Sequence, residues 1–394
     1  MTEIYLTIFF ISLLLFLLGS GVWVGLSMIT VSAIGMLLFT TRPVGDAMAT
    51  TIWGTSSSWT LTALPLFVWM GEILFRTKLS ENLFKGLSPW LSKLPGGLVH
   101  VNVVGCALFA AISGSSAATV ATVGKMSIPE LRKRKYPEKL LLGSLAGSGT
   151  LGLLIPPSII LIIYGVTIED SIAKLFMAGI LPGIMIALMF MLYVILWSIL
   201  NKRLMPKSNE SFSFLEKIQG SKQLLPVIFL ITAVISSIYT GIATATEAAS
   251  LGVVGALILS FFQGTLNRKT FKLSLLGATK TSCMIAFILA GSTFLSLAMG
   301  FTGLPRNLAI WIDAMNLSPY TLLFVLTIFY IILGMFLDGI SAVVLTMAII
   351  EPMIRQAGFD MIWFGIYLVI VVEMAQITPP VGFNLFVLQG MANK

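Results

Sequence analysis

Two stretches of small polar residues interrupt apolar sequence and have the composition of cation-binding sites. The first is Ser113-Gly114-Ser115-Ser116, followed along the chain by the proline-containing segment 149–158. The second is Asp338-Gly339-Ile340-Ser341, followed by Pro379-Pro380. Small residues let the backbone turn tightly, hydroxyl groups supply oxygen atoms, and proline leaves carbonyl groups unpaired. Such oxygens can replace the hydration shell of Na⁺, and helix N-termini nearby can receive a carboxylate.

Four carboxylates in apolar sequence are candidates for the same chemistry. A charged side chain inside a membrane is costly, so each is a functional candidate by default. We expect Asp338 to be functional because it sits at the turn between two apolar arms. Glu373 could instead be structural, paired or protonated, and Glu72 and Glu247 leave both roles equally open. Helix packing is the alternative for the serine-rich stretch, because small side chains also let helices approach closely.

The composition places these stretches in a membrane protein. Of 394 residues, 57% are hydrophobic and 10% are charged, whereas soluble domains carry about 25% charged residues. At about 20 apolar residues per crossing, the chain has room for roughly ten segments in a lipid bilayer. The first segment lacks a basic region and a cleavage site, which indicates a retained helix and not a signal peptide. The net charge of +8 is typical of basic cytoplasmic loops and does not indicate a nucleic-acid partner.

Similar motifs recur in the two halves of the chain at nearly constant spacing. The pattern T-x-L-x-x-N-L occurs at 77–83 and again at 302–308, an offset of 225 residues. At the same offset, the glycine of the first polar stretch matches Gly339, and the proline pairs match at an offset of 223. Three matches in the same order predict an internal repeat.

The distribution of basic residues predicts how the two halves are oriented. We expect 97–128 and 319–354 to be re-entrant hairpins, and 139–166 and 359–390 to be single crossings broken at the proline pairs. One face of the membrane then carries 20 of the 24 Lys and Arg residues. By the positive-inside rule this face is cytoplasmic. The N-terminus is then periplasmic, the first hairpin opens from the cytoplasm, the second opens from outside, and the halves are inverted.

The fold class predicted is an all-α polytopic membrane protein with two inverted-topology repeats, re-entrant helical hairpins and broken helices. The predicted first repeat spans 1–200 and consists of a scaffold at 1–75, an interfacial arm helix at 79–91, a hairpin at 97–128, a broken helix at 139–166 and a helix at 172–200. A cytoplasmic linker follows at 201–222. The predicted second repeat spans 223–394 and consists of a scaffold at 223–301, an arm helix at 304–314, a hairpin at 319–354 and a broken helix at 359–390. The counterpart of 172–200 is missing from the second half, so we expect the natural chain to be longer by about one helix. Inverted repeats with helices broken at mid-membrane are typical of secondary transporters. The enzyme signatures H-E-x-x-H and G-x-S-x-G are absent, and with no nucleotide site an ion gradient is the natural energy source.

Four long motifs resemble the large membrane subunit of tripartite ATP-independent periplasmic (TRAP) transporters. They are S-G-S-S-A-A-T-V-A-T-V-G at 113–124, I-P-E-L-R-K-R-K-Y-P at 128–137, G-T-L-G-L-L-I-P-P-S at 149–158 and I-T-P-P-V-G-F-N-L-F-V at 377–387. The resemblance extends over nearly the whole chain. It implies a Na⁺-coupled elevator-type importer in the bacterial inner membrane. It also implies two partners, a small membrane subunit beside the scaffold and a periplasmic substrate-binding protein.

The resemblance further implies two Na⁺ sites with an organic-acid substrate between them. The first site would use Ser113, Ser115, Ser116, Gly152, Ile155 and Pro156. The second would use Gly339, Ser341, Ala375, Thr378 and Pro379. The candidate substrate-binding residues are Ser113, Ser116, Ser158, Asp338 and Asn384. Ala375 stands where glycine is common in the family, but a carbonyl ligand survives that change.

The second polar stretch resembles the sialic-acid and sugar-acid members of the family more than the C4-dicarboxylate members. Sialic acid is therefore the first expectation for the substrate. A C4-dicarboxylate, another sugar acid, and a stand-alone anion/Na⁺ symporter without partners are the alternatives. A channel or purely structural membrane subunit is the alternative from another class, and it would show neither saturation nor dependence on a binding protein.

Overall fold

The computed structural model describes residues 2–77, 79–206, 213–222, 224–303, 307, 318–379 and 382–392. Within these ranges the chain consists of α-helices and short 3-10 turns, without a β-strand. A helix satisfies its backbone hydrogen bonds internally, as a hydrocarbon environment demands. The prediction of an all-α polytopic membrane protein is confirmed.

Several helices are long and apolar enough to cross a membrane. In the described part of the chain, four single helices meet this condition: α11 (Ile172–Leu200), α14 (Ala245–Phe262), α15 (Arg268–Thr302) and α18 (Gly339–Gln356). If each of three bent helix pairs also counts as one span, the described residues hold up to seven possible spans. On α11, large apolar side chains such as Leu181 and Leu192 are exposed on the outer surface. Water would make such a surface unfavourable, whereas lipid accommodates it.

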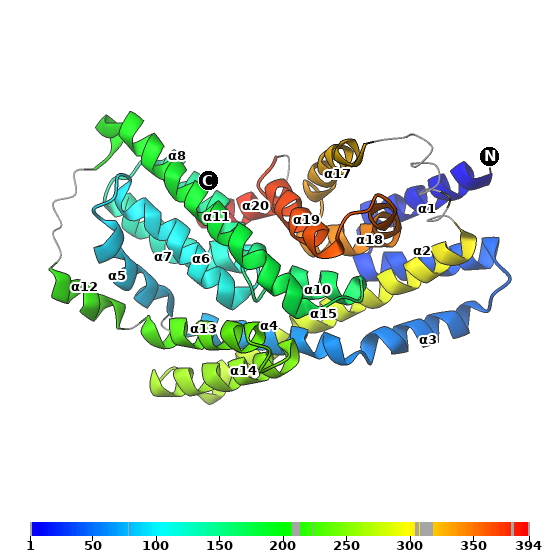
Figure 1. Cartoon of the computed structure of the whole chain (residues 1–394), viewed down its shortest axis with the longest axis horizontal. Coiled ribbons are helices and arrows are strands. Elements are labelled where there is room, and N and C mark those ends of the chain that lie inside the picture. Colours follow the sequence, from blue (N-terminus) through cyan, green and yellow to red (C-terminus); the bar gives the residue numbers. More distant parts are fainter. Residues whose placement is uncertain are drawn as a thin grey trace.

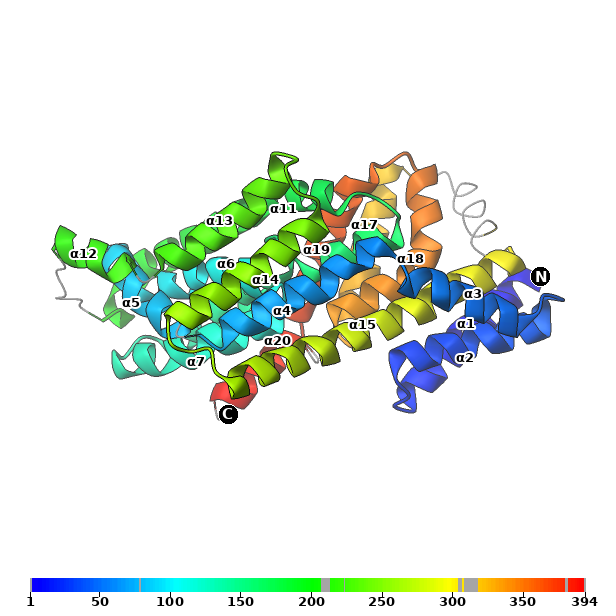
Figure 2. The same ribbon diagram turned by 90° about the horizontal axis from the view of Figure 1, so that it is seen from below.

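A scaffold of seven helices runs along the long axis of the molecule (Figure 1). Its members are α1 (Thr2–Gly19), α2 (Val24–Phe39), α3 (Val44–Ser56), α4 (Ala63–Phe75), α13 (Leu225–Tyr239), α14 and α15. The long helix α15 packs against α2, α3 and α4, while α14 lies between α4 and α13 (Figure 2). Helices from both halves of the sequence therefore form one continuous layer.

A second group of helices carries the two hairpins and the two broken helices. It consists of α6 (His100–Ser113), α7 (Ser116–Lys133), α8 (Glu138–Gly149), α9 (Leu151–Leu154), α10 (Ile159–Thr167), α11, α17 (Pro319–Gly334), α18, α19 (Met361–Gln376) and α20 (Phe383–Ala392). The run of α8 and α9 bends by 40° into α10. The bend falls at Pro156-Pro157, where proline removes backbone donors. The hydroxyl of Tyr164 on α10 donates to the carbonyl of Met361 on α19 at 2.7 Å, which joins the two broken helices.

The connections between these groups are more helical than the sequence indicated. The polar linker 201–222 contains α12 (Phe214–Ser221), which packs on the arm helix α5 (Leu79–Leu91). Trp90 Nε1 on α5 donates to Ser221 Oγ on α12 at 2.8 Å. The basic segment 263–280, which lies within the predicted scaffold 223–301, forms the first part of α15 from Arg268 onward. The predicted arm helix 304–314 lies outside the described residues except for Asn307.

Candidate functional site

The first hairpin turns at Gly114 and rests on the first proline break. Gly114 has φ +57°, a left-handed conformation that glycine adopts without strain. A Cβ atom there would lie 3.1 Å from the carbonyl oxygen of Pro157, so the close approach also requires glycine. The N–H of Ile159 donates to the Gly114 carbonyl at 3.4 Å. The tip and the break predicted from the sequence are therefore in direct contact.

Hydroxyl groups gather at this first tip. Ser113 Oγ lies 2.8 Å from Thr119 Oγ1, which also donates to the Ser115 carbonyl at 2.8 Å. Ser115 caps the N-terminus of α7 by accepting from the N–H of Ala118. The broken helix approaches so closely that a Cβ on Gly152 would lie 2.7 Å from the Ser115 carbonyl. Thr119 was not among the predicted ligands, although its place one turn after the serines was an available signal.

The second hairpin meets the second break in a similar way. Asp338 caps α18, and its Oδ2 accepts from the N–H of Ser341 at 3.1 Å. Gly339 packs against the side chains of Gln376 and Val372 on α19. This capping bond fixes the Asp338 carboxylate at the start of the helix, where the helix dipole favours a negative charge.

The backbone around the second break is partly engaged in local hydrogen bonds. The Thr378 hydroxyl donates to the Met374 carbonyl at 2.7 Å, and the Thr378 N–H donates to the Ala375 carbonyl at 3.0 Å. Ala375 is buried against Gly334 at the end of α17. Pro379 is exposed, and Pro380 lies outside the described residues.

The two halves meet between the hairpin tips. Ser116 Oγ, at the start of α7, donates to Glu373 Oε1 on α19 at 2.5 Å. A Cβ on Gly339 of the second tip would lie 3.5 Å from the Leu153 side chain beside the first break. Residues more than 180 positions apart therefore form one cluster. No local sequence pattern signals the contact between Ser116 and Glu373.

A cavity of about 480 Å³ lies between this cluster and the scaffold. Its lining is Val68, Gly71, Glu72, Phe75, Ser113, Ser115, Ser116, Ala117, Ala118, Ala121, Leu153, Ile159, Thr281, Met284, Asp338, Gly339, Ile340, Gln376 and Phe383. Five predicted site residues line it, three serines of the first tip with Asp338 and Gly339. The lining holds two acidic side chains and, among the residues the structure describes, no Lys or Arg.

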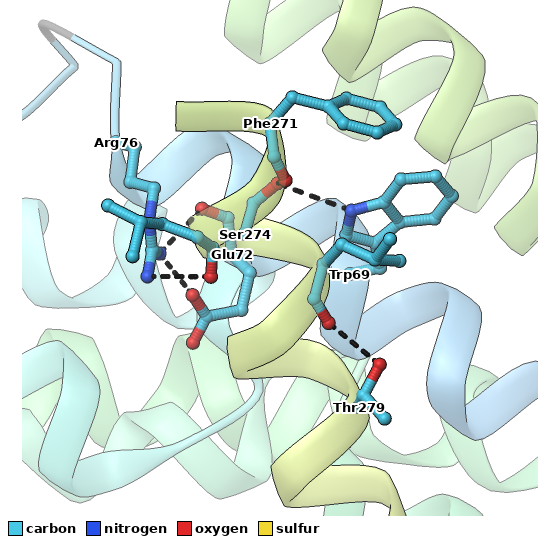
Figure 3. A network of polar contacts seen from close by, with 8 residues as sticks. Trp69, Glu72, Arg76, Phe271, Ser274 and Thr279 are labelled. Atoms are coloured by element: carbon cyan, nitrogen blue, oxygen red, sulfur yellow. Dashed lines mark hydrogen bonds and ion pairs between the residues drawn. The ribbon is translucent and has the colours of Figure 1, made fainter. Parts of the chain in front are cut away.

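The scaffold wall of the cavity contains a polar network (Figure 3). Glu72 forms an ion pair with Arg76, which also donates to the Leu273 carbonyl of α15 at 3.2 Å. Trp69 Nε1 lies 3.3 Å from Ser274 Oγ on the same helix. A Cβ on Gly277 would lie 2.6 Å from Glu72 Oε2, so α15 leaves room for this carboxylate. The structure thus places Glu72, whose role the sequence left open, in the cavity wall.

The remaining predicted site residues do not line the cavity. These residues are Gly152, Ile155, Pro156, Ser158, Ser341, Ala375, Thr378, Pro379 and Asn384. Ser158 is fully buried, donates to the Leu153 carbonyl and caps α10. Asn384 is also fully buried, and neither polar atom of its amide has a hydrogen-bond partner among the described residues. Glu247 forms a capping box with Thr244 at the start of α14, which is a structural role.

Known proteins with similar sequence or fold are transporters. The family described as "Tripartite ATP-independent periplasmic transporter, DctM component" matches residues 10–394. The C4-dicarboxylate TRAP transporter large permease protein DctM of Pseudomonas aeruginosa is 33% identical over 90% of this chain and 82% of its own length. The sialic acid TRAP transporter large permease protein SiaM of Vibrio cholerae is 31% identical over 94% of this chain and 86% of its own length. The solved structure of the Alcanivorax borkumensis YdaH transporter superposes with a TM-score of 0.62 at 13% identity, covering 94% of this chain and 90% of that chain, and shows a similar fold.

The fold and the site define a polytopic membrane transporter with paired hairpin tips around a central cavity. The chain belongs to the DctM family, the large membrane subunits of TRAP transporters. It is a permease and not an enzyme.

Proposed function

We propose that this permease couples the uptake of an organic acid to Na⁺ entry across the bacterial inner membrane, by an elevator movement of the hairpin group against the scaffold. The observation that carries the proposal is the charge of the cavity lining. Its charged side chains are Asp338 and Glu72, of which Glu72 is already paired with Arg76, and no basic side chain lines it in the described part of the chain. An anion entering such a cavity needs positive charge from another source.

Two sources of positive charge are available at the tips. The N-termini of α7 and α18 point their first residues at the cavity, and each helix dipole supplies about half a positive charge. The rest would come from Na⁺ bound by the oxygens of each tip. Because the anion is then held by ions that bind with it, substrate and Na⁺ stabilise each other's binding, which is the physical basis of coupling.

For the first Na⁺ site, the proposed ligands are the oxygens of Ser113, Ser115 and Ser116 with carbonyls of Gly152, Ile155 and Pro156. The close approach of Gly152 to Ser115 supports this set. The second site would use Gly339 and Ser341 with carbonyls of Ala375, Thr378 and Pro379. It rests on the mirrored sequence offset and on the contact between Gly339 and α19.

Sialic acid is the first substrate that we propose, and a C4-dicarboxylate has equal support. The relatives' names include both substrates, at similar identity to this chain. The word tripartite in the family description supports two further subunits. We propose that these are a small membrane subunit beside the scaffold and a periplasmic substrate-binding protein.

The test is uptake of radiolabelled sialic acid, and separately of succinate, into proteoliposomes that contain all three components. We expect saturable uptake that requires an inward Na⁺ gradient and stops when a Na⁺ ionophore dissipates it. Uptake that persists in Na⁺-free choline buffer would refute the coupling. Uptake that continues without the binding protein would favour a stand-alone symporter.

A further inference from the structure

The linker helix α12 and the arm helix α5 pack closely at one end of the molecule (Figures 1 and 2). A Cβ atom on Gly220 would lie 3.2 Å from the Lys85 carbonyl oxygen, and one on Gly86 would lie 3.1 Å from the Gly220 carbonyl oxygen. Trp90 Nε1 also donates to Ser221 Oγ at 2.8 Å. The close backbone approach and this hydrogen bond hold the side chains of the two helices in fixed relative positions.

The pair of helices exposes several large apolar side chains. They are Phe214, Leu215 and Ile218 on α12 and Trp90 on α5. The rings of Phe214 and Trp90 pack edge to face with their centroids 6.4 Å apart. The exposed apolar surface continues along the chain onto α13, where Phe229 is also exposed. Since α12 bends by 59° away from α13, which forms part of a possible span, it has the arrangement of a helix lying at the membrane surface.

Basic side chains accompany this apolar surface. Four lysines lie on the two helices or within two residues of their ends: Lys85, Lys93, Lys217 and Lys222. Lys222 follows Ile218 by one helical turn and Leu215 by two, so it lies on the exposed apolar face of α12. Lys217 Nζ lies 5.3 Å from the centroid of the Trp90 ring, a cation–π contact. The ion pairs among the described residues include none of the four lysines.

The charge of these segments favours an anionic partner. Residues 79–93 and 213–222 carry four lysines and two glutamates, a net charge of +2. The glutamate of α12, Glu216, accepts from the N–H of Ser213 at 2.7 Å and so caps its own helix. A protein interface would bury the lysine amines, which such interfaces usually exclude from their centres. A lipid surface instead leaves each amine at the level of the headgroups, with aromatic and aliphatic side chains below it.

We propose that α5 and α12 form a binding surface for anionic phospholipids of the cytoplasmic leaflet. The four lysines contact the headgroup phosphates, and the exposed apolar side chains of α12 lie among the acyl chains. Because α5 connects scaffold helix α4 with hairpin helix α6, the bound lipids hold this connection at the membrane surface. This inference depends neither on Na⁺ coupling nor on the identity of the substrate.

The experiment measures which lipids lie beside Trp90, by quenching of tryptophan fluorescence with brominated phospholipids. The purified full chain is reconstituted into two sets of vesicles with the same fractions of phosphatidylglycerol and phosphatidylcholine. In one set the phosphatidylglycerol is brominated, and in the other an equal amount of the phosphatidylcholine is. The wild-type signal minus that of Trp90→Phe gives the quenching at Trp90. We expect it to be severalfold stronger with brominated phosphatidylglycerol, since each lysine near an anionic surface favours binding by about fivefold.

Removal of the exposed amines tests their role. Lys85→Gln, Lys93→Gln and Lys222→Gln combined should make quenching at Trp90 equal for the two lipids, each variant being compared with its own Trp90→Phe counterpart. All three side chains are exposed, so the melting temperature should stay close to that of wild type. If this triple variant does not fold, Lys222→Gln alone should show a partial loss of the preference.

The matched control changes three exposed lysines outside this surface. Lys133→Gln, Lys135→Gln and Lys139→Gln combined alter the net charge equally, but no large apolar side chain is exposed within 131–140. This control should keep the wild-type preference for phosphatidylglycerol. Equal quenching by both lipids in wild type would overturn the proposal, as would a preference that survives in the first triple variant or disappears in the control. Absence of quenching at Trp90 by either lipid would exclude a lipid occupant.

Discussion

A methyl group added at Gly152 tests whether the contact between the first tip and the first break sets transport activity. The Cβ atom of Gly152→Ala would lie 2.7 Å from three backbone atoms, the carbonyl carbon and oxygen of Ser115 and the Cα of Ser116. No side chain can rotate away to relieve this overlap, since all three atoms belong to the backbone. The tip and the broken helix must therefore separate.

The size of the effect follows from this distance. Ordinary contacts begin near 3.4 Å, so the two segments must move apart by about 0.7 Å. Overpacking of this kind costs about 1–3 kcal/mol. Binding sites tolerate displacements of only about 0.5 Å. We therefore expect a melting temperature lower by a few degrees and a loss of uptake of about tenfold or more.

The assay is Na⁺-driven uptake in proteoliposomes, with a thermal-shift measurement on the same preparation. Gly143→Ala is the matched control, because it lies on α8 of the same broken helix and a Cβ there meets no atom within 4 Å. It should leave uptake unchanged and stability equal or slightly higher, since alanine favours helix over glycine. Wild-type uptake and stability in Gly152→Ala would refute the reasoning that this contact positions the tip.

Substitutions at three further positions test other parts of the site. Asp338→Asn retains a capping side chain at the N-terminus of α18 and should keep stability within about 0.5 kcal/mol, whereas Asp338→Ala should lose about 1 kcal/mol of stability. Both variants should abolish uptake. Near-normal uptake by either variant would show that transport does not need the Asp338 charge. Tyr164→Phe removes the hydrogen bond to the Met361 carbonyl and should lower stability by about 1 kcal/mol while transport persists, which thermal-shift and uptake assays read separately. Gly71→Leu places a side chain where a Cβ already lies 2.7 Å from the Ile112 carbonyl oxygen, so uptake should fall sharply. Gly54→Ala, on an open face of α3, is its control. Equal uptake by both variants would show that α4 does not need this close approach.

Sequence reasoning located the turns and breaks because these depend on local conformation. Gly114 permits the left-handed turn between α6 and α7, and Pro156-Pro157 interrupts the helix that follows. Both effects act within a few residues, so they are visible without knowledge of the fold. The basic residues of 263–280, within the predicted scaffold 223–301, indicated a position at the membrane face but did not show that α15 begins there, at Arg268. Charge there indicates the chemical environment and not the backbone conformation.

The membrane class, the positions of the two tips and the family could be predicted from the sequence, because composition and contiguous motifs carry that information. Tertiary structure alone decided which side chains meet. Ser116 and Glu373 are 257 residues apart, and only the packing of α7 near α19 brings their oxygens within 2.5 Å. Glu72 joins the cavity for a similar reason, since Gly277 on α15 leaves space for its carboxylate. Such contacts depend on how helices are placed in space, and a pattern of neighbouring residues does not encode them.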